Sequence, residues 1–137
     1  MKYLVDTNVL SQATKVVPHP GIDHWWKQRE AGDLLLSVVS IHEIRLGIQL
    51  MQAGRRRSQI EAWYLAEVLG KFDGRILPVD SPVADASGRL LAEAKLLGRG
   101  AELGDVLIAA TALVHGLQVV TLNRKHFEGL GVELVEL

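Results

Sequence analysis

The sequence predicts an open α/β fold, with a mainly parallel sheet of about five strands and helices on both faces. Short apolar segments alternate along the chain with longer amphipathic ones, and strands that alternate with helices pair in parallel through right-handed crossovers. The segment 34–39 (LLLSVV) is almost continuously apolar rather than alternating, as expected for a strand that is covered on both faces. Ligands of such a sheet bind beyond the carboxyl ends of its strands.

Each expected element follows from local pattern and punctuation. The expected strands are 2–5, 34–39, 75–79, 118–121 and 132–135. After the first strand we expect a short turn or helix through Ser11 and Gln12, and a break at Pro18 to Pro20. The expected longer helices are 24–29, 40–51, 58–72, 81–97 and 104–115. The last of these is apolar almost all round, which predicts burial, and Gly116 ends it.

Composition limits the possible chemistry. With 137 residues and 48% apolar content, we expect one domain, residues 1–137, with one core. The absence of cysteine excludes disulfides, thiolate catalysis and thiolate metal sites, so oxygen or imidazole must hold any metal. The 15 basic and 16 acidic residues nearly balance, and the longest apolar stretch is too short for a membrane span. We therefore expect a cytoplasmic protein with no membrane contact.

Polar residues cluster where strands are expected to end and helices to begin. Asp6 follows the first strand, Glu43 lies in the first turn after the second, Asp105 begins the helix 104–115, and Asn123 follows the fourth strand. The topology places all of them on one rim of the sheet. Carboxylates are hard ligands that favour Mg²⁺ or Mn²⁺, and such a site suits hydrolysis of a phosphodiester.

Each of these residues also has a simple structural explanation. Asp6 and Asn8 are compatible with a turn that ends a strand. Ser40 and Glu43 match the S-x-x-E capping box, and an acid such as Asp105 is favoured in any first helical turn. It is the combination of these groups on one rim that favours a ligand site.

The stretches YLVDTNVLS, LLLSVVSIHEIRLGI, GRILPVD, GDVLIAATALVHGLQVVTLNRKHF and GVELVEL cover nearly the whole chain. In them the sequence resembles PIN-domain ribonucleases, specifically the VapC/FitB-like toxins of bacterial toxin-antitoxin pairs. The resemblance implies a PIN-like fold with a protruding helical hairpin, and a Mg²⁺- or Mn²⁺-dependent endoribonuclease. It also implies that Asp6, Glu43 and Asp105 are the metal ligands and catalytic residues.

The same resemblance assigns supporting roles around these acids. Asn8, Ser40, Thr121 and Asn123 would act as hydrogen-bond partners or as a further contact near the metal. Family members commonly carry another aspartate after the fourth strand, and here the corresponding positions hold Asn123 and His126. The resemblance therefore predicts one metal ion rather than two.

The resemblance also implies partners: an RNA substrate, a VapB-like antitoxin and a second copy of the chain in a homodimer. The helices 40–51 and 58–72 would form the hairpin that receives the antitoxin. The stripe of Trp63, Tyr64 and Leu65 agrees with a binding surface, although a place in the core explains it equally well.

Two other functions stay open at the level of sequence. A phosphatase with an aspartate nucleophile at Asp6 would need a second aspartate two residues later, where the chain has Asn8. A non-catalytic module that binds metal or a basic peptide would need the acids alone, and the missing fourth acid is compatible with it.

Overall fold

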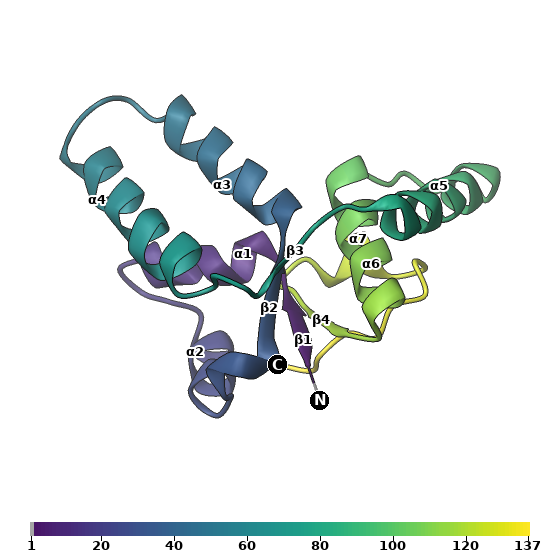
Figure 1. Ribbon diagram of the computed structural model, residues 1–137, viewed down its shortest axis with the longest axis horizontal. Helices are drawn as coiled ribbons and strands as arrows, with labels where there is room; N and C mark the ends of the chain where they lie inside the picture. The colour runs from purple at the N-terminus through teal and green to yellow at the C-terminus, as the bar shows by residue number, and fades with distance from the viewer. Residues whose placement is uncertain (1) are drawn as a thin grey trace.

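The structure is a computed structural model that describes residues 2–137, and it is built on a parallel four-stranded sheet (Figure 1). The strands are β1 (Tyr3–Val5), β2 (Leu34–Ser37), β3 (Ile76–Leu77) and β4 (Gln118–Val120). Their order across the sheet is β3-β2-β1-β4, and every pairing is parallel. The connection from β3 to β4 therefore passes to the far side of β1.

Helices cover both faces of this sheet. They are α1 (Thr7–Leu10), α2 (Pro20–Lys27), α3 (Val38–Leu50), α4 (Arg55–Trp63), α5 (Ser81–Leu96), α6 (Leu103–His115) and α7 (Arg124–Phe127). Two 3₁₀ turns, η1 (Ser11–Thr14) and η2 (Ala31–Asp33), lie before β2, and a π-helical segment, η3 (Tyr64–Gly70), continues α4. In Figure 1, α3 and α4 project together as a hairpin, while α5 extends on the opposite side of the molecule.

The core consists of two apolar layers separated by the sheet. Val5 and Leu36 pack with Trp25 and Val68 in the layer under α1 to α4. Leu4 faces the other way, into the layer formed mainly by α6 and α7. Successive strand residues point to opposite faces and both faces are covered, which explains why Leu34 to Leu36 of the central strand β2 are continuously apolar. The expectation of a strand covered on both faces is confirmed for these residues, and Ser37 at the end of β2 is polar but buried.

The fold class is confirmed, but the expectation of about five strands is wrong for residues 2–137. The segment 132–135 forms only an isolated parallel bridge between Val119 and Leu134. Its backbone hydrogen bonds join Glu133 and Val135 to Val119 alone. The same strand β4 pairs with β1 at all three of its residues, so the segment 132–135 contacts the sheet edge without forming a strand.

The second strand ends earlier than its apolar pattern predicts. Ser37 is the N-cap of α3, and its Oγ accepts a 3.0 Å hydrogen bond from the backbone N–H of Val39. Val38 and Val39 are therefore helical, although their β-branched side chains favour strands. Ser40 lies inside the helix and is fully buried, so the capping-box explanation of Ser40 and Glu43 is wrong.

Two other helices differ from expectation at their starts. Helix α2 begins at Pro20, where a break was expected, because proline is well tolerated in the first helical turn. His19 caps it, since its Nδ1 accepts hydrogen bonds from the N–H groups of Gly21 and Ile22. The expected helix 58–72 begins at Arg55 and changes to π-helical geometry at Tyr64.

Across residues 2–137, none of the helices has the length and apolarity needed to cross a bilayer.

Candidate active site

The site lies at the topological switch point of the sheet, where the crossover connections change direction. Strand β1 pairs with β2 on one side and with β4 on the other, so successive crossovers diverge from the carboxyl ends of β1 and β4. This is the position at which open α/β sheets bind ligands. Asp6 directly follows β1 and Thr121 directly follows β4, so both residues stand at that position.

Both carboxylate oxygens of Asp6 accept hydrogen bonds. Oδ1 accepts a 2.8 Å hydrogen bond from the backbone N–H of Thr7, which makes Asp6 the N-cap of α1. Oδ2 accepts a 2.8 Å hydrogen bond from the Thr121 hydroxyl. The side chain is only 5% exposed. The turn interpretation of Asp6 is thus compatible with a role in the site, because each oxygen keeps a second lone pair.

Burial sets the electrostatics of Asp6. It raises the pKa of the carboxyl group from 3.8 to about 6, and the negative charges of Asp105 and Glu43 act in the same direction. The hydrogen bonds from Thr121 and Thr7 oppose the rise in pKa. Since Asp105 and Glu43 repel the charge of the buried Asp6 carboxylate, a cation bound near all three would stabilise the ionised form of Asp6.

Glu43 is connected to Asp6 through Thr7. The Thr7 hydroxyl donates a 2.8 Å hydrogen bond to Oε1 of Glu43 and lies 2.9 Å from the Ser40 hydroxyl. Because Thr7 has one hydroxyl proton, Ser40 is the donor in the second contact. Thr7 was missed by the sequence reasoning, and its only signal is its place between Asp6 and Asn8.

Asp105 lies in the first turn of α6 and is half-buried. Desolvation raises the pKa of Asp105, the charge of His126 lowers it, and that of Glu102 raises it further. His126 Nδ1 lies 3.1 Å from Asp105 Oδ2. His126, noted in the sequence only for occupying the position of an acid, is therefore in direct contact with a candidate ligand.

The two asparagines occupy less direct positions. Asn8 Oδ1 accepts a 3.2 Å hydrogen bond from the N–H of Leu122, so it joins α1 to the loop after β4. Asn8 Nδ2 is buried and has no hydrogen-bond partner within residues 2–137. The backbone N–H of Asn123 donates to the Thr121 hydroxyl at 2.9 Å, and its side chain is exposed.

A cleft of about 510 Å³ separates α3 from the start of α6 and contains both Glu43 and Asp105. Its lining residues are Val38, Val39, His42, Glu43, Leu46, Glu102, Leu103, Gly104, Asp105 and Leu107. A Cβ atom at Gly104 would lie 3.7 Å from Glu43 Oε2, which shows how closely the two helices approach. Asp6 is buried and is not part of the lining.

The carboxylates fit a hard divalent cation only with the help of water. In the part of the chain that the structure describes, no group of three or more acidic or histidine side chains is close enough to hold a metal ion by itself. Mg²⁺ commonly uses one or two carboxylates and keeps several waters. Burial, and to a smaller extent the charges of Asp105 and Glu43, disfavour the ionised form of Asp6, and a bound cation would offset both effects, so this donor set fits one.

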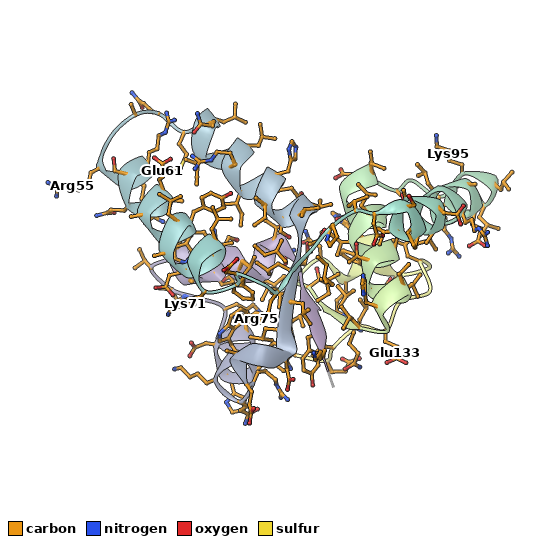
Figure 2. The ribbon with its side chains drawn as sticks, in the orientation of Figure 1. Arg55, Glu61, Lys71, Arg75, Lys95 and Glu133 are labelled. Carbon is orange, nitrogen blue, oxygen red and sulfur yellow. The ribbon has the colours of Figure 1, made fainter. Side chains whose placement is uncertain are left out.

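A second, larger cavity lies on the other side of the hairpin. It has a volume of about 630 Å³ and is lined by residues of η1, α2, α4 and η3. Trp26, Trp63 and Phe72 contribute aromatic surface, and Lys71 and Arg75 contribute positive charge. Figure 2 shows Lys71 and Arg75 near the base of α4, far from Lys95 at the opposite end of the molecule. We call this cavity the aromatic groove.

Comparison with known proteins agrees with this architecture. The family model described as the PIN domain matches residues 3–131. The VapC ribonuclease Y4jK of Sinorhizobium fredii is 34% identical over 96% of this chain and 94% of its own. The toxin FitB of Neisseria gonorrhoeae is 34% identical over 90% of this chain and 89% of its own.

A solved structure is similar over the same extent. The crystal structure of FitAcB from Neisseria gonorrhoeae superposes with a TM-score of 0.90, at 32% identity, over 98% of this chain and 96% of that one. The parallel α/β fold is thus shared over nearly the whole chain. The chain belongs to the PIN-domain family.

Proposed function

We propose that this chain is a metal-dependent endoribonuclease that hydrolyses RNA phosphodiester bonds and acts as the toxin of a toxin-antitoxin pair. The observation that supports this most directly is the buried Asp6 carboxylate, which Thr121 holds at the switch point of the sheet. Burial raises its pKa, and the charges of Asp105 and Glu43 add to the rise. Relatives that carry the names ribonuclease and toxin align over most of the chain.

The three acids have defined roles in this proposal. Asp6, Glu43 and Asp105 would hold Mg²⁺ or Mn²⁺, with water completing the coordination. A bound divalent ion supplies Lewis-acid stabilisation of the charge that develops on the phosphate oxygens. Thr121 and the backbone of Thr7 orient Asp6, and the Thr7 hydroxyl orients Glu43. Since Asn123 and His126 supply no carboxylate, we expect one metal ion.

The aromatic groove is the surface we assign to the antitoxin. It is largely apolar, and it is open to solvent between α2 and the hairpin formed by α3 and α4. Within the sequence-predicted stripe, Tyr64 is buried in the core, Trp63 lines the groove and Leu65 is 51% exposed. The stripe therefore combines the two interpretations that its sequence allowed. The FitAB and VapBC neighbours are solved as assemblies bound to DNA.

A homodimer is proposed for a different surface. Val38, Leu46 and Leu50 lie at helical spacing along the exposed side of α3, and Leu103 is 58% exposed across the cleft. Large apolar side chains that share one face of a small domain mark an association surface. A second copy at this face would lie next to the candidate active site.

Cleavage of RNA by the purified protein tests the proposal. We expect activity with Mn²⁺ or Mg²⁺, loss of activity with EDTA, and loss in Asp6→Asn and Asp105→Asn. Asp73→Asn is the matched control, because Asp73 is exposed and lies outside the cleft. Unchanged activity in both folded site variants would contradict the assigned residues. Absence of cleavage on every RNA tested would favour the binding module, and cleavage of a phosphomonoester alone would favour the phosphatase.

A further inference from the structure

His126 has a position that none of the roles described so far explains. It belongs to the short helix α7, and its neighbour Phe127 is 1% exposed in the core layer under α6. The imidazole itself is 51% exposed, whereas the side chain of Asp105 that it contacts is 17% exposed. The buried phenylalanine anchors the backbone, so the histidine stands at a defined place beside the cleft.

A continuous series of hydrogen bonds connects this histidine with Asp6. The Thr121 hydroxyl donates to Asp6, and the backbone N–H of Asn123 donates to that hydroxyl. The N–H of His126 then donates to the Asn123 carbonyl at 3.0 Å. Nδ1 of His126 completes the series, 3.1 Å from Asp105 Oδ2. The loop after β4 thus reaches two of the three candidate ligands.

We infer that His126 is a positioning residue, which donates its Nδ1–H to Asp105 Oδ2 and so fixes the carboxylate in the orientation that binds the metal ion. This inference rests on the proposed function. Only Oδ2 of Asp105 has a side-chain partner within residues 2–137, so Oδ1 keeps its lone pairs for a ligand. A carboxylate at position 126 has no proton to donate in its ionised form, so an aspartate there could not act in this way.

The contact also restricts the tautomer of the histidine. An imidazole that donates from Nδ1 carries its acceptor lone pair on Nε2 when it is neutral. Outer hydrogen-bond partners of this kind hold a metal ligand in one rotamer, and their removal lowers metal affinity even though they never touch the ion. The expected signature is therefore reduced metal affinity with an intact fold.

Mn²⁺ binding to the full chain tests the inference, with titration calorimetry and with electron paramagnetic resonance of the free ion. His126→Ala removes the Nδ1–H donor and leaves the anchor at Phe127 in place. We expect Mn²⁺ affinity to fall roughly ten-fold in His126→Ala, because this is the size of effect that outer partners have. His126→Asn keeps an N–H at the position of Nδ1, and we expect it to restore most of the affinity.

His24→Ala is the matched control, because His24 is exposed in α2 and lies outside the cleft. We expect it to leave Mn²⁺ affinity unchanged. An affinity in His126→Ala that equals or exceeds that of the wild type overturns the inference, and so does a His126→Asn variant as weak as His126→Ala. Asp105→Asn separates the two proposals: if it abolishes binding while His126→Ala does not weaken it, only the positioning role fails. A wild-type chain that binds no Mn²⁺ overturns both proposals.

A second measurement needs no metal. The ¹⁵N chemical shifts of the His126 ring report which nitrogen carries the proton. We expect the Nδ1–H tautomer in the metal-free wild type and a shift toward Nε2–H in Asp105→Asn. An Nε2–H tautomer in the wild type overturns the inference, because Nδ1 would then have no proton to donate.

Discussion

The hydroxyl of Thr121 donates a 2.8 Å hydrogen bond to Oδ2 of Asp6, and the two residues lie 115 positions apart in the chain. Both follow the ends of adjacent parallel strands, so the hydrogen bond links the carboxyl ends of β1 and β4 at the switch point. It also fixes one oxygen of a carboxylate that is almost fully buried. The candidate site is thus attached to β1, which pairs with a neighbour on each side, and to β4.

Replacing Thr121 by valine tests this attachment. Thr121→Val keeps the shape but leaves the buried Asp6 oxygen without its donor, and we expect it to lower the free energy of unfolding by about 1 to 3 kcal/mol. The pKa of Asp6 should rise further, because this hydrogen bond opposes the rise. Urea denaturation at neutral pH measures the loss. Thr121→Ser retains the hydroxyl and should stay close to the wild type, and equal stability of the valine and serine variants would contradict the argument.

The stability of the metal-free protein should depend on pH through Asp6. Its pKa is 3.8 when exposed and about 6 in the fold, so the folded state binds the proton more tightly than the unfolded state. The stabilisation from Asp6 is complete below the lower value and is lost as the pH rises through the upper one. The difference between the two pKa values corresponds to about 3 kcal/mol in the free energy of unfolding.

Denaturation series in EDTA between pH 4 and pH 7.5 measure this effect as the difference between the wild type and Asp6→Asn. We expect Asp6→Asn to be the more stable protein at the upper end of the range, with the difference shrinking as the pH falls. Burial also raises the pKa of Asp105, so the difference in stability between Asp105→Asn and the wild type should change with pH in the same direction. A difference that does not change with pH would contradict the assignment.

Divalent cations should reverse this destabilisation. Above the pKa of Asp6, which is about 6, the Asp6 carboxylate is ionised, and a cation that binds only the folded state stabilises that state. At a concentration one hundred times Kd the gain is about 2.7 kcal/mol. We therefore expect Mn²⁺ to raise Tm in the wild type and EDTA to reverse the rise. The same increase in Asp6→Asn would show that the ion binds elsewhere.

Glycines in two helices offer a test of the fold that is independent of the site. Gly47 in α3 and Gly88 in α5 are exposed, and an added Cβ would meet nothing within 4 Å at either position. We expect Gly47→Ala and Gly88→Ala each to stabilise the protein by about 0.5 to 1 kcal/mol. Gly116→Ala is the opposite control. Gly116 ends α6 at φ +66°, so we expect its replacement by alanine to destabilise the protein. Thermal unfolding of the three variants measures both signs.

The local sequence pattern predicted the order of strands and helices, but it did not predict the residues at which they begin and end. The apolar segments and helical periodicities correctly indicated alternating strands and helices. Ser37 shows the limit: its hydroxyl begins α3 within an apolar run that by itself reads as a longer strand. The weak segment 132–135 reads as a strand because its residues favour one, but only one bridge forms.

By itself the sequence determined the fold class, the place of Asp6 after a strand and that of Asp105 in the first turn of a helix, because hydrophobic periodicity and capping preference act over a few residues. The expected place of Glu43 in a first turn is wrong, since α3 begins at Val38. Only the tertiary structure decided which groups contact which acid. The bond from Thr7 to Glu43 spans 36 positions, and the contact of His126 with Asp105 joins α7 to α6. Such contacts depend on how the helices pack against the sheet, and nothing in the local pattern of residues encodes them.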